Sequence, residues 1–316
     1  MSFFVRMLPG PLVKVFARPY VAGASLREAL AVVESLHEKK LLSTMDLLWE
    51  DIHHQEEVDA VINVYTQMIQ ACAAYPENWR PTVSLKPSSY TTKALQRGEG
   101  MDAAGSREAI LTFSEEAKAK NVGLTIDMED HHWTEWTLRL LEEIWAAGGF
   151  HVGAVLQTRL NRTREDLERI PPEARVRLVI GIYNEAPEIA ITDRAQMKVR
   201  MLEYAEILLK KGCFVEFATH DERIIHRFLE EVVPEAGVDA SRFELQMLYG
   251  VPREGIQQQL VQGKLGALGP VSVRLYVPFA TDWSLATAYC KRRLLENPQM
   301  ATAVLKNLGR ALLGRK

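Results

Sequence analysis

Polar side chains able to do chemistry stand at the end of one short apolar run after another along this chain. Each has an ordinary structural explanation: Lys86 can extend a packed stem to solvent, and Asp127 can cap a helix. Their recurrence at corresponding positions is more informative than any single residue, and it disfavours a scaffold without catalytic activity. The residues are Asp46, Glu50, Lys86, Asp127, Glu129, Gln157, Tyr183, Thr219, His220, Asp221, Gln246, Tyr249, Arg274 and Tyr276.

The segment Asp127–His132 reads DMEDHH and combines carboxylates with imidazoles, which are the usual ligands of zinc and iron. His131 and His132 are adjacent, however, so they point in different directions on a helix or a strand. The first apolar run has no HxH pair, and HExxH occurs nowhere in the chain. We therefore expect no metal, and a metal-dependent barrel hydrolase is a minor alternative.

A second dense cluster, YCKRRLLEN, spans Tyr289–Asn297. On a helix, Arg292 and Glu296 are four residues apart and Arg293 and Glu296 are three apart, so each pair shares a face. One interpretation is a solvated helix face with a Glu–Arg pair. The other is a fork of guanidinium groups that binds a carboxylate or phosphate through paired hydrogen bonds. The composition of the cluster does not decide between them.

Eight β-rich runs alternate with helical stretches from residue 40 onward. Several are almost continuously apolar, as parallel strands buried on both faces are. Thr192 and Asp193 provide a cap for the helical stretch that ends at Gly212. The pattern predicts an α/β fold of the (β/α)₈ TIM-like barrel type, with functional side chains at the carboxyl ends of the strands. An open doubly wound sheet is the alternative, but no GxGxxG follows the first run. The predicted strands are Ser43–Trp49, Thr82–Lys86, Gly123–Met128, His151–Gln157, Arg177–Ile182, Phe214–Thr219, Phe243–Leu248 and Val271–Val277.

The predicted organisation has three parts. Residues 1–40 form an N-terminal helical segment, residues 41–297 form the barrel, and residues 298–316 form a basic amphipathic tail. A C-terminal helix is expected to lie over the barrel mouth. Hydrophobic residues make up 47% and charged residues 25% of the chain, which is ordinary globular composition. The formal net charge of −3 shows no basic excess that would call for nucleic acid.

Cysteine usage and the two chain ends bear on location. The three cysteines are scattered and form no CxxC, which fits a reducing compartment. The N-terminus lacks a long apolar core and is interrupted by Pro9 and Pro11, so we expect neither a signal peptide nor a membrane span. Residues 1–27 contain cations but no acid before Glu28, and residues 297–316 contain no acid either. These ends are either solvated or in contact with an anionic membrane surface. We expect a cytoplasmic protein, with peripheral contact at the inner face of the membrane.

Over roughly residues 16–297 the chain resembles the proline dehydrogenase family, and in particular its FAD-dependent, monofunctional bacterial members. These are flavin-dependent (β/α)₈ barrels that oxidise proline, alone or within bifunctional proline-utilisation proteins. The order and spacing of the motifs on successive strands carry the resemblance. The motifs are VFARPYVAGASLREAL, STMDLLWE, VSLKPS, TIDMED, VLQTRL, RLVIGIYNE, FATHD, FELQMLYG, RLYVPF and YCKRRLLEN.

The resemblance implies an FAD over the carboxyl end of the barrel, with Lys86, Asp127 and Arg177 as catalytic residues. Arg177 would lie near flavin N5, and Lys86 and Asp127 beside the ring system and the substrate. Further cofactor contacts implied are Gln157, Thr219, His220, Arg293 and Glu296. The implied substrate contacts are Lys86, Tyr183, Leu248, Tyr276, Arg292 and Arg293, of which the last two hold the proline carboxylate.

The implied reaction is oxidation of L-proline to pyrroline-5-carboxylate by hydride transfer to flavin N5, with electrons passed on to a quinone. Clamping the carboxylate fixes the geometry for this transfer, while the flavin supplies the redox chemistry. The alternative is a 4-hydroxyproline dehydrogenase. Tyr276 argues against it, because a bulky phenol near C4 leaves little room for a hydroxyl group.

Five positions depart from the family pattern. Most members have Lys at the position of Ile180 and Ala at that of Ile182, so that KGAY is replaced here by IGIY. Tyr is common at the position of Arg159, and Gly at those of Trp49 and Ala280. The missing lysine affects the expected flavin contacts, and Ile182 and Trp49 are expected to narrow the mouth of the barrel.

Overall fold

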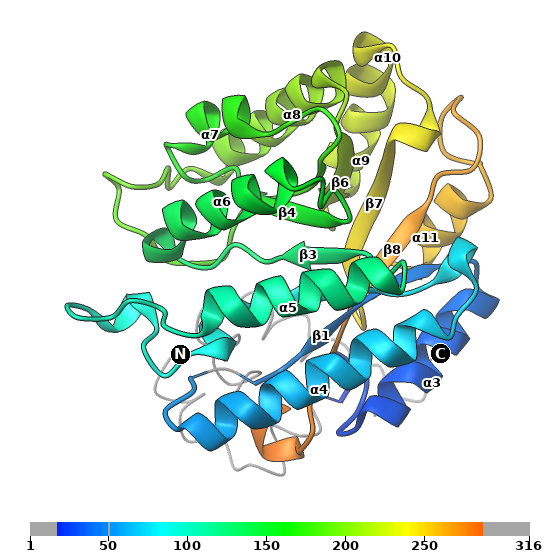
Figure 1. The fold of residues 1–316 in the computed structure, drawn as a ribbon. Helices are drawn as coiled ribbons and strands as arrows, with labels where there is room; N and C mark the ends of the chain where they lie inside the picture. The colour runs from blue at the N-terminus through cyan, green and yellow to red at the C-terminus, as the bar shows by residue number, and fades with distance from the viewer. Residues whose placement is uncertain (1–17, 50, 287–316) are drawn as a thin grey trace, which may run out of the picture.

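The computed structural model describes residues 18–49 and 51–286. Its centre is a closed barrel of eight parallel strands in sequential order (Figure 1). Closure is made by β1 and β8, which pair from Leu42 opposite Arg274 to Leu47 opposite Phe279. The strands are β1 (Leu42–Leu47), β2 (Thr82–Leu85), β3 (Leu124–Ile126), β4 (Val152–Gln157), β5 (Arg175–Val179), β6 (Phe214–Ala218), β7 (Phe243–Leu248) and β8 (Val273–Phe279).

The predicted eight-stranded barrel is confirmed, and an open doubly wound sheet is ruled out. The expected strand ends were less accurate, because apolar residues also continue into the loops. β5 was predicted as Arg177–Ile182 but begins two residues earlier and ends at Val179, before Gly181 with its positive φ of 99°. The expected helix over the barrel mouth and the tail 298–316 lie outside the described residues. The boundaries 1–40 and 41–297 stay predictions.

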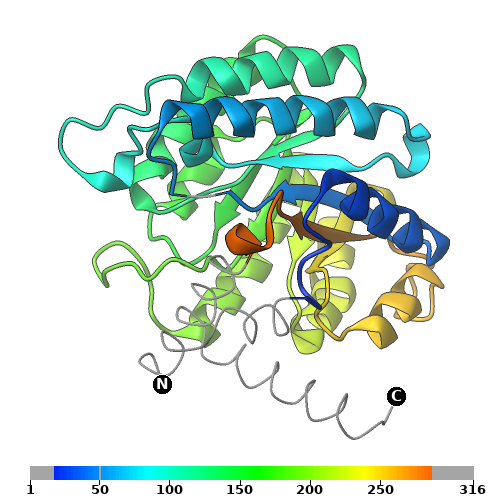
Figure 2. The ribbon, with the colours of Figure 1, turned by 90° about the horizontal axis from the view of Figure 1, so that it is seen from below.

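Helices surround the barrel, and α4 and α5 run side by side along its outside (Figures 1 and 2). None of the described helices is long and apolar enough to cross a membrane. The α-helices are α3 (Leu26–Glu38), α4 (Gln55–Ala73), α5 (Ser106–Ala119), α6 (His131–Ala146), α7 (Thr163–Arg169), α8 (Arg194–Lys211), α9 (Glu222–Arg227), α10 (Val233–Ala236) and α11 (Glu254–Val261). Short turns of other helix types are η1 (Glu77–Trp79), η2 (Pro87–Tyr90), η3 (Leu95–Arg97), the π-helical η4 (Phe228–Val232) and η5 (Ala240–Arg242).

Side-chain caps fix where several helices begin at the carboxyl side of the barrel. The carboxylate of Asp193 accepts from the backbone N–H of Ala195 and starts α8, which ends at Gly212 in a left-handed conformation. This confirms the predicted cap and stop. The carboxylate of Asp130 caps α6 and that of Asp221 caps α9 in the same way. Asp127 does not cap a helix, so its carboxylate is available for other contacts.

The strands are buried on both faces, yet the lumen of the barrel is not apolar. Arg177 on β5 donates from Nη1 to Ser84 Oγ on β2, 2.9 Å away. Because β2 and β5 are not neighbours in the barrel, this bond has to cross its interior. Buried charges are tolerated only when they are paired and hydrogen-bonded. The other buried polar side chains of β6–β8 are Glu216, Glu244, Gln246 and Arg274.

Candidate active site

Three of the predicted residues meet at the carboxyl end of the barrel around one carboxylate. Asp127 follows β3, and its Oδ1 lies 2.8 Å from Arg177 Nη1 on β5. Its Oδ2 accepts a hydrogen bond of 2.7 Å from the phenol of Tyr276 on β8. Burial opposes the positive charge of Arg177, but Asp127 and Glu216 raise its pKa. The guanidinium therefore keeps its positive charge in a buried setting.

Lys86 joins this group from the end of β2. Its ammonium forms an ion pair with Asp46 on β1, in which both side chains are buried. Lys86 Nζ also lies 3.5 Å from the phenol oxygen of Tyr276. Burial raises the pKa of Asp46, and the charge of Lys86 opposes that rise. The site thus presents two buried cations, each held by a carboxylate.

Glu129 links the β2, β3 and β4 ends of the site. Its two carboxylate oxygens accept from the backbone N–H of Ser88, at 2.8 Å, and from the Ser88 hydroxyl, at 2.5 Å. Its backbone carbonyl accepts from Gln157 Nε2 at 2.7 Å. Burial raises the pKa of Glu129 to about 7, because desolvation outweighs the bonds from Ser88. Glu129 therefore ties the loop after Lys86 to the segment that contains Asp127.

The β5–α8 loop carries Tyr183 and lies against Gln157. Gly181 has a φ of 99°, and a Cβ atom there would clash with Gln157 Oε1 and the side chain of Arg159. Arg159 Nη1 in turn donates to the backbone carbonyl of Tyr183. Ile182, in the same loop, is 49% exposed. This loop therefore follows the end of β4 closely.

The segment after β6 makes a second part of the site. The backbone N–H of Leu248 donates to His220 Nε2 at 3.1 Å, so the proton of the neutral ring is on Nδ1. Burial, together with the charge of Arg253, lowers the pKa of His220 to about 4, which keeps the ring neutral. Leu248 itself is 40% exposed at the end of β7. Thr219 donates from its backbone N–H to the carbonyl of Gln246 at 3.1 Å.

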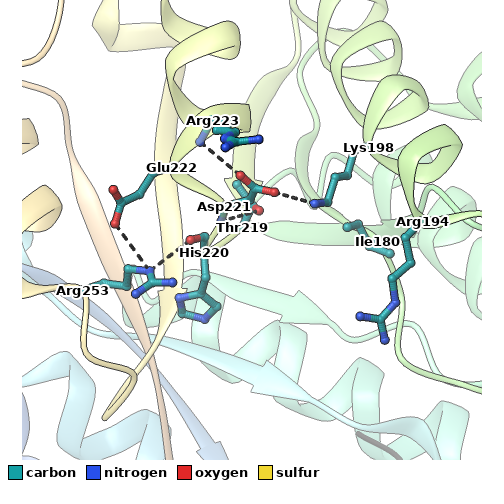
Figure 3. Close-up of a pocket in the computed structure, with 9 residues that line it drawn as sticks. All are labelled: Ile180, Arg194, Lys198, Thr219, His220, Asp221, Glu222, Arg223 and Arg253. Atoms are coloured by element: carbon teal, nitrogen blue, oxygen red, sulfur yellow. Dashed lines mark hydrogen bonds and ion pairs between the residues drawn. The ribbon is translucent and has the colours of Figure 1, made fainter. Parts of the chain in front are cut away.

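A cavity of about 680 Å³ adjoins this segment. In Figure 3, Lys198 and Arg194 reach toward it from α8, and Arg253 stands on the other side of His220. Asp221 pairs with Lys198 at 2.5 Å. Four cations and two acids line the cavity, so it is suited to an anionic ligand. The lining residues are Ile180, Arg194, Lys198, Thr219, His220, Asp221, Glu222, Arg223 and Arg253.

Several buried polar atoms of the site have no hydrogen-bond partner within the part of the chain that the structure describes. They include Arg177 Nη2, Gln157 Oε1 and His220 Nδ1. Leaving a buried polar group unpaired costs about 1–3 kcal/mol, so such atoms indicate a missing ligand or ordered water. All three belong to residues for which the family resemblance implies contact with the cofactor.

The metal hypothesis receives no support from the described geometry. His131 Nδ1 lies 2.6 Å from Glu185 Oε2, and His132 Nδ1 lies 3.2 Å from Asp130 Oδ1. Among residues 18–49 and 51–286, no three potential ligands gather as a metal ion requires.

The structure thus brings together eight of the predicted site residues at the carboxyl end of the barrel, and Tyr183 lies in the adjoining loop. Arg292, Arg293 and Glu296 lie outside the described residues. Sequence reasoning gave no role to four partners: Asp46, Ser84, Glu129 and Gln246. Three of these were visible as polar residues at strand ends, whereas Ser84 lies within β2 and gave no signal. The eight residues are Lys86, Asp127, Gln157, Arg177, Thr219, His220, Leu248 and Tyr276.

Comparison with known proteins decides the family. A sequence profile described as Proline dehydrogenase matches residues 29–306. The chain belongs to the proline dehydrogenase family. It is 33% identical over 298 residues to the proline dehydrogenase of Deinococcus radiodurans, covering 92% of this chain and 89% of that one. It is 32% identical over 294 residues to proline dehydrogenase 1 of Bacillus subtilis strain 168, covering 92% and 90%.

A solved structure supports the fold of this proline dehydrogenase family member. Proline utilization A from Bdellovibrio bacteriovorus, inactivated by N-propargylglycine, superposes with a TM-score of 0.78 at 23% identity. The match covers 91% of this chain and 33% of that one, so the chain spans about a third of the larger protein. The family resemblance predicted from the motifs is confirmed, including its likeness to stand-alone bacterial members.

Proposed function

We propose that this protein oxidises L-proline to pyrroline-5-carboxylate with a non-covalently bound FAD, and that a quinone then takes up the electrons. Membership of the proline dehydrogenase family supports the substrate and the reaction. The observation that carries the proposal is the convergence of buried, partly unpaired polar groups at the carboxyl end of the barrel, next to a cavity lined mainly by cations. The carboxyl end is where barrel enzymes of this type place their active sites.

The residues present fit FAD. Arg177 Nη2 and His220 Nδ1 are buried donors without a partner in the described structure, and Gln157 Oε1 is a buried acceptor. A flavin ring offers acceptors and donors to such groups, and the dinucleotide adds a pyrophosphate. Arg194, Lys198 and other cations of the cavity would neutralise the pyrophosphate charge. When bound, the flavin supplies the acceptor for the hydride from proline.

The remaining contribution of the protein is to position the substrate against the cofactor. Arg177 is held by Asp127 and Ser84, so the position of its positive charge is fixed before the substrate binds. Lys86, anchored by Asp46, adds a second cation, beside the flavin ring and the substrate. The substrate amine releases its proton to bulk water, and no dedicated base is required. Fixing the reacting carbon against its acceptor in this way accounts for much of the acceleration in such reactions.

The proline carboxylate is assigned to Arg292 and Arg293, which lie outside the described residues. Each charge-assisted bond to a carboxylate contributes about 1.5–3 kcal/mol. Either residue changed to Ala should raise KM for proline about 10-fold or more, with a smaller effect on flavin content. Lys at either site should also be harmful, because a point charge does not replace the planar fork. Unchanged KM in both Ala variants would refute this assignment.

Tyr183, Leu248 and Tyr276 are assigned to the wall around the substrate ring. Tyr276 already donates its only phenolic proton to Asp127, so it has none to offer a C4 hydroxyl. Burying a hydroxyl without a partner costs about 1–3 kcal/mol. We therefore expect proline to be favoured over trans-4-hydroxyproline by about 10-fold or more in kcat/KM, and Tyr276→Ser to narrow the gap. Equal kcat/KM values for both substrates would show that Tyr276 does not lie against the substrate ring.

The cations and apolar residues of the two chain ends support weak, salt-sensitive contact with an anionic membrane, where quinones reside. Residues 1–17 and 287–316 lie outside the described part of the chain, so the argument is one of composition. Co-sedimentation with anionic and with neutral vesicles at low salt tests it. Equal recovery in the supernatant with both vesicle types would remove the idea.

A visible spectrum of the purified protein tests the central proposal. Flavin absorption bands are expected, and anaerobic addition of proline should bleach them. Acid precipitation should release the yellow chromophore into the supernatant, where it is identified as FAD by chromatography. A colourless protein that neither binds added FAD nor reacts with proline would overturn the proposal, and colour that stays in the pellet would refute non-covalent binding.

A further inference from the structure

Gln246, on β7, occupies a position between two carboxylates and the guanidinium of Arg177. Its Nε2 donates to Glu216 Oε2 and to Glu244 Oε1, each at 2.7 Å. Its Oε1 accepts from Arg177 Nε at 2.6 Å. We propose that Gln246 is a positioning residue that fixes the guanidinium plane of Arg177, and so sets which of its N–H groups faces the reaction site. The inference rests on the role of Arg177 in the proposed function.

The orientation of the Gln246 amide is dictated by its neighbours. An amide has two N–H donors and one carbonyl acceptor, while an ionised carboxylate only accepts. Against the effect of burial, the cations Arg274 and Arg175 lower the pKa of Glu244, so that carboxylate is ionised at neutral pH. With both N–H groups donated to the two glutamates, only the carbonyl oxygen remains for Arg177. The bond to Nε therefore cannot be replaced by a flip of the amide.

The bond between Arg177 Nε and Gln246 restrains the orientation of the guanidinium plane, which the other hydrogen bonds of Arg177 do not. Ser84 and Asp127 both accept from the same nitrogen, Nη1, at 2.9 and 2.8 Å. Two contacts at one corner leave the guanidinium free to tilt about that corner. The bond from Nε to Gln246 fixes a second edge of the plane. Nη2 is then the one nitrogen of this group left without a partner in the described structure, and it is buried.

A neutral side chain at position 246 also suits the charge balance of the lumen. Glu216 Oε2 lies 3.5 Å from Arg177 Nε, so it is a more distant partner than the amide. A third carboxylate here would stand against Glu216 and Glu244, and like charges buried together repel. The amide instead neutralises neither partner, donates to both acids and still presents an acceptor to Arg177.

The test compares Gln246→Met with a matched control, Gln257→Met. Met has the length of Gln but makes none of the three hydrogen bonds of Gln246. Gln257 is equally buried and contacts the sulfur of Met247, the next residue of β7, from α11 outside the barrel. With the holoenzyme in single turnover, we expect Gln246→Met to slow flavin reduction by proline about 10- to 100-fold and to change the half-saturating proline concentration less than about threefold. The control should stay within about twofold of the wild type.

A double-mutant cycle separates positioning from general damage to the fold. In an Arg177→Met background, Gln246→Met should slow the reaction by less than about twofold, because the residue it positions is gone. The inference is overturned if Gln246→Met retains the wild-type rate, or if its effect is equally large in the Arg177→Met background.

The outcome for the wild type distinguishes this inference from the proposed function. A wild-type protein that shows no flavin bands and no reaction with proline refutes the proposed function. The Arg177–Gln246 bond is then tested by urea unfolding of the same four proteins, in which the pair should be coupled by about tenfold or more in the unfolding equilibrium constant. Additive effects of the two substitutions would overturn the positioning role.

Discussion

Glu129 makes the stability of this protein depend on pH in a direction opposite to that of most carboxylates. Burial raises the pKa of Glu129 from its ordinary value of 4.5 to about 7. The folded chain therefore binds a proton that the unfolded chain has released between these two pH values. Stability due to this group is fully present below about pH 4.5 and is lost as pH rises through about 7.

The magnitude follows from the size of the rise. A change in pKa from 4.5 to about 7 corresponds to about 3 kcal/mol of stability, since the carboxyl is fully buried. Between about pH 5 and pH 8, most of this amount, about 2–3 kcal/mol, should disappear. Glu129→Gln removes the titration while keeping an acceptor for the backbone N–H of Ser88.

Urea unfolding of wild type and Glu129→Gln at several pH values measures the difference directly. The two proteins should be close in stability near pH 5, and the variant should gain about 2–3 kcal/mol relative to wild type by pH 8. Taking the difference cancels the other titrating groups. Glu99→Gln, at an exposed glutamate in the β2–α5 segment, is the control and should show no such trend. A difference that stays constant across the pH range, or that moves the other way, would refute the reasoning.

Three further changes probe the site and its supports. Tyr276→Phe removes the bond to the Asp127 carboxylate and should destabilise the protein by about 1.5–3 kcal/mol in urea unfolding. Asp46→Asn leaves Lys86 buried without its anion and should lower the free energy of unfolding by about 3–5 kcal/mol. The double variant Asp46→Asn with Lys86→Met should lose less than the sum of the two single variants. Additive losses would contradict a buried ion pair. Gly250→Ala should lower the melting temperature by several degrees, because φ is 79° there and a Cβ would clash with a backbone carbonyl of the N-terminal segment; an unchanged melting temperature would show that this segment yields.

The sequence determined the architecture because the strands and helices of the barrel each follow a local pattern of residues. Apolar runs short enough for strands alternate with helical stretches, and each pattern depends on residues only a few positions apart. Caps such as Asp193 and stops such as Gly212 act within a single turn of helix, so they too can be recognised without the fold. The motifs that identify the family have the same character, since each is a short string at the end of one strand.

Most of the described site could also be predicted from the sequence, because functional side chains of such barrels lie at the carboxyl ends of the strands. Parallel strands in a barrel all point the same way, so their carboxyl ends share one face. Lys86, Asp127 and Tyr276 were predicted on this basis, and the structure brings all three together. The prediction was weakest where strands pass into loops. β5 ends at Val179 and not at Ile182, because the path of a loop depends on the elements beside it.

Only the tertiary structure decided which of these side chains bond to each other. Asp127 meets Arg177 across 50 residues of sequence and Tyr276 across 149. Such pairings depend on the register and closure of the whole barrel, and a shift of one residue in a strand would turn each side chain to the other face. Burial is set in the same way. The raised pKa of Glu129 and the buried bond between Gln246 and Arg177 arise from solvent exclusion by distant segments, which no short stretch of sequence encodes.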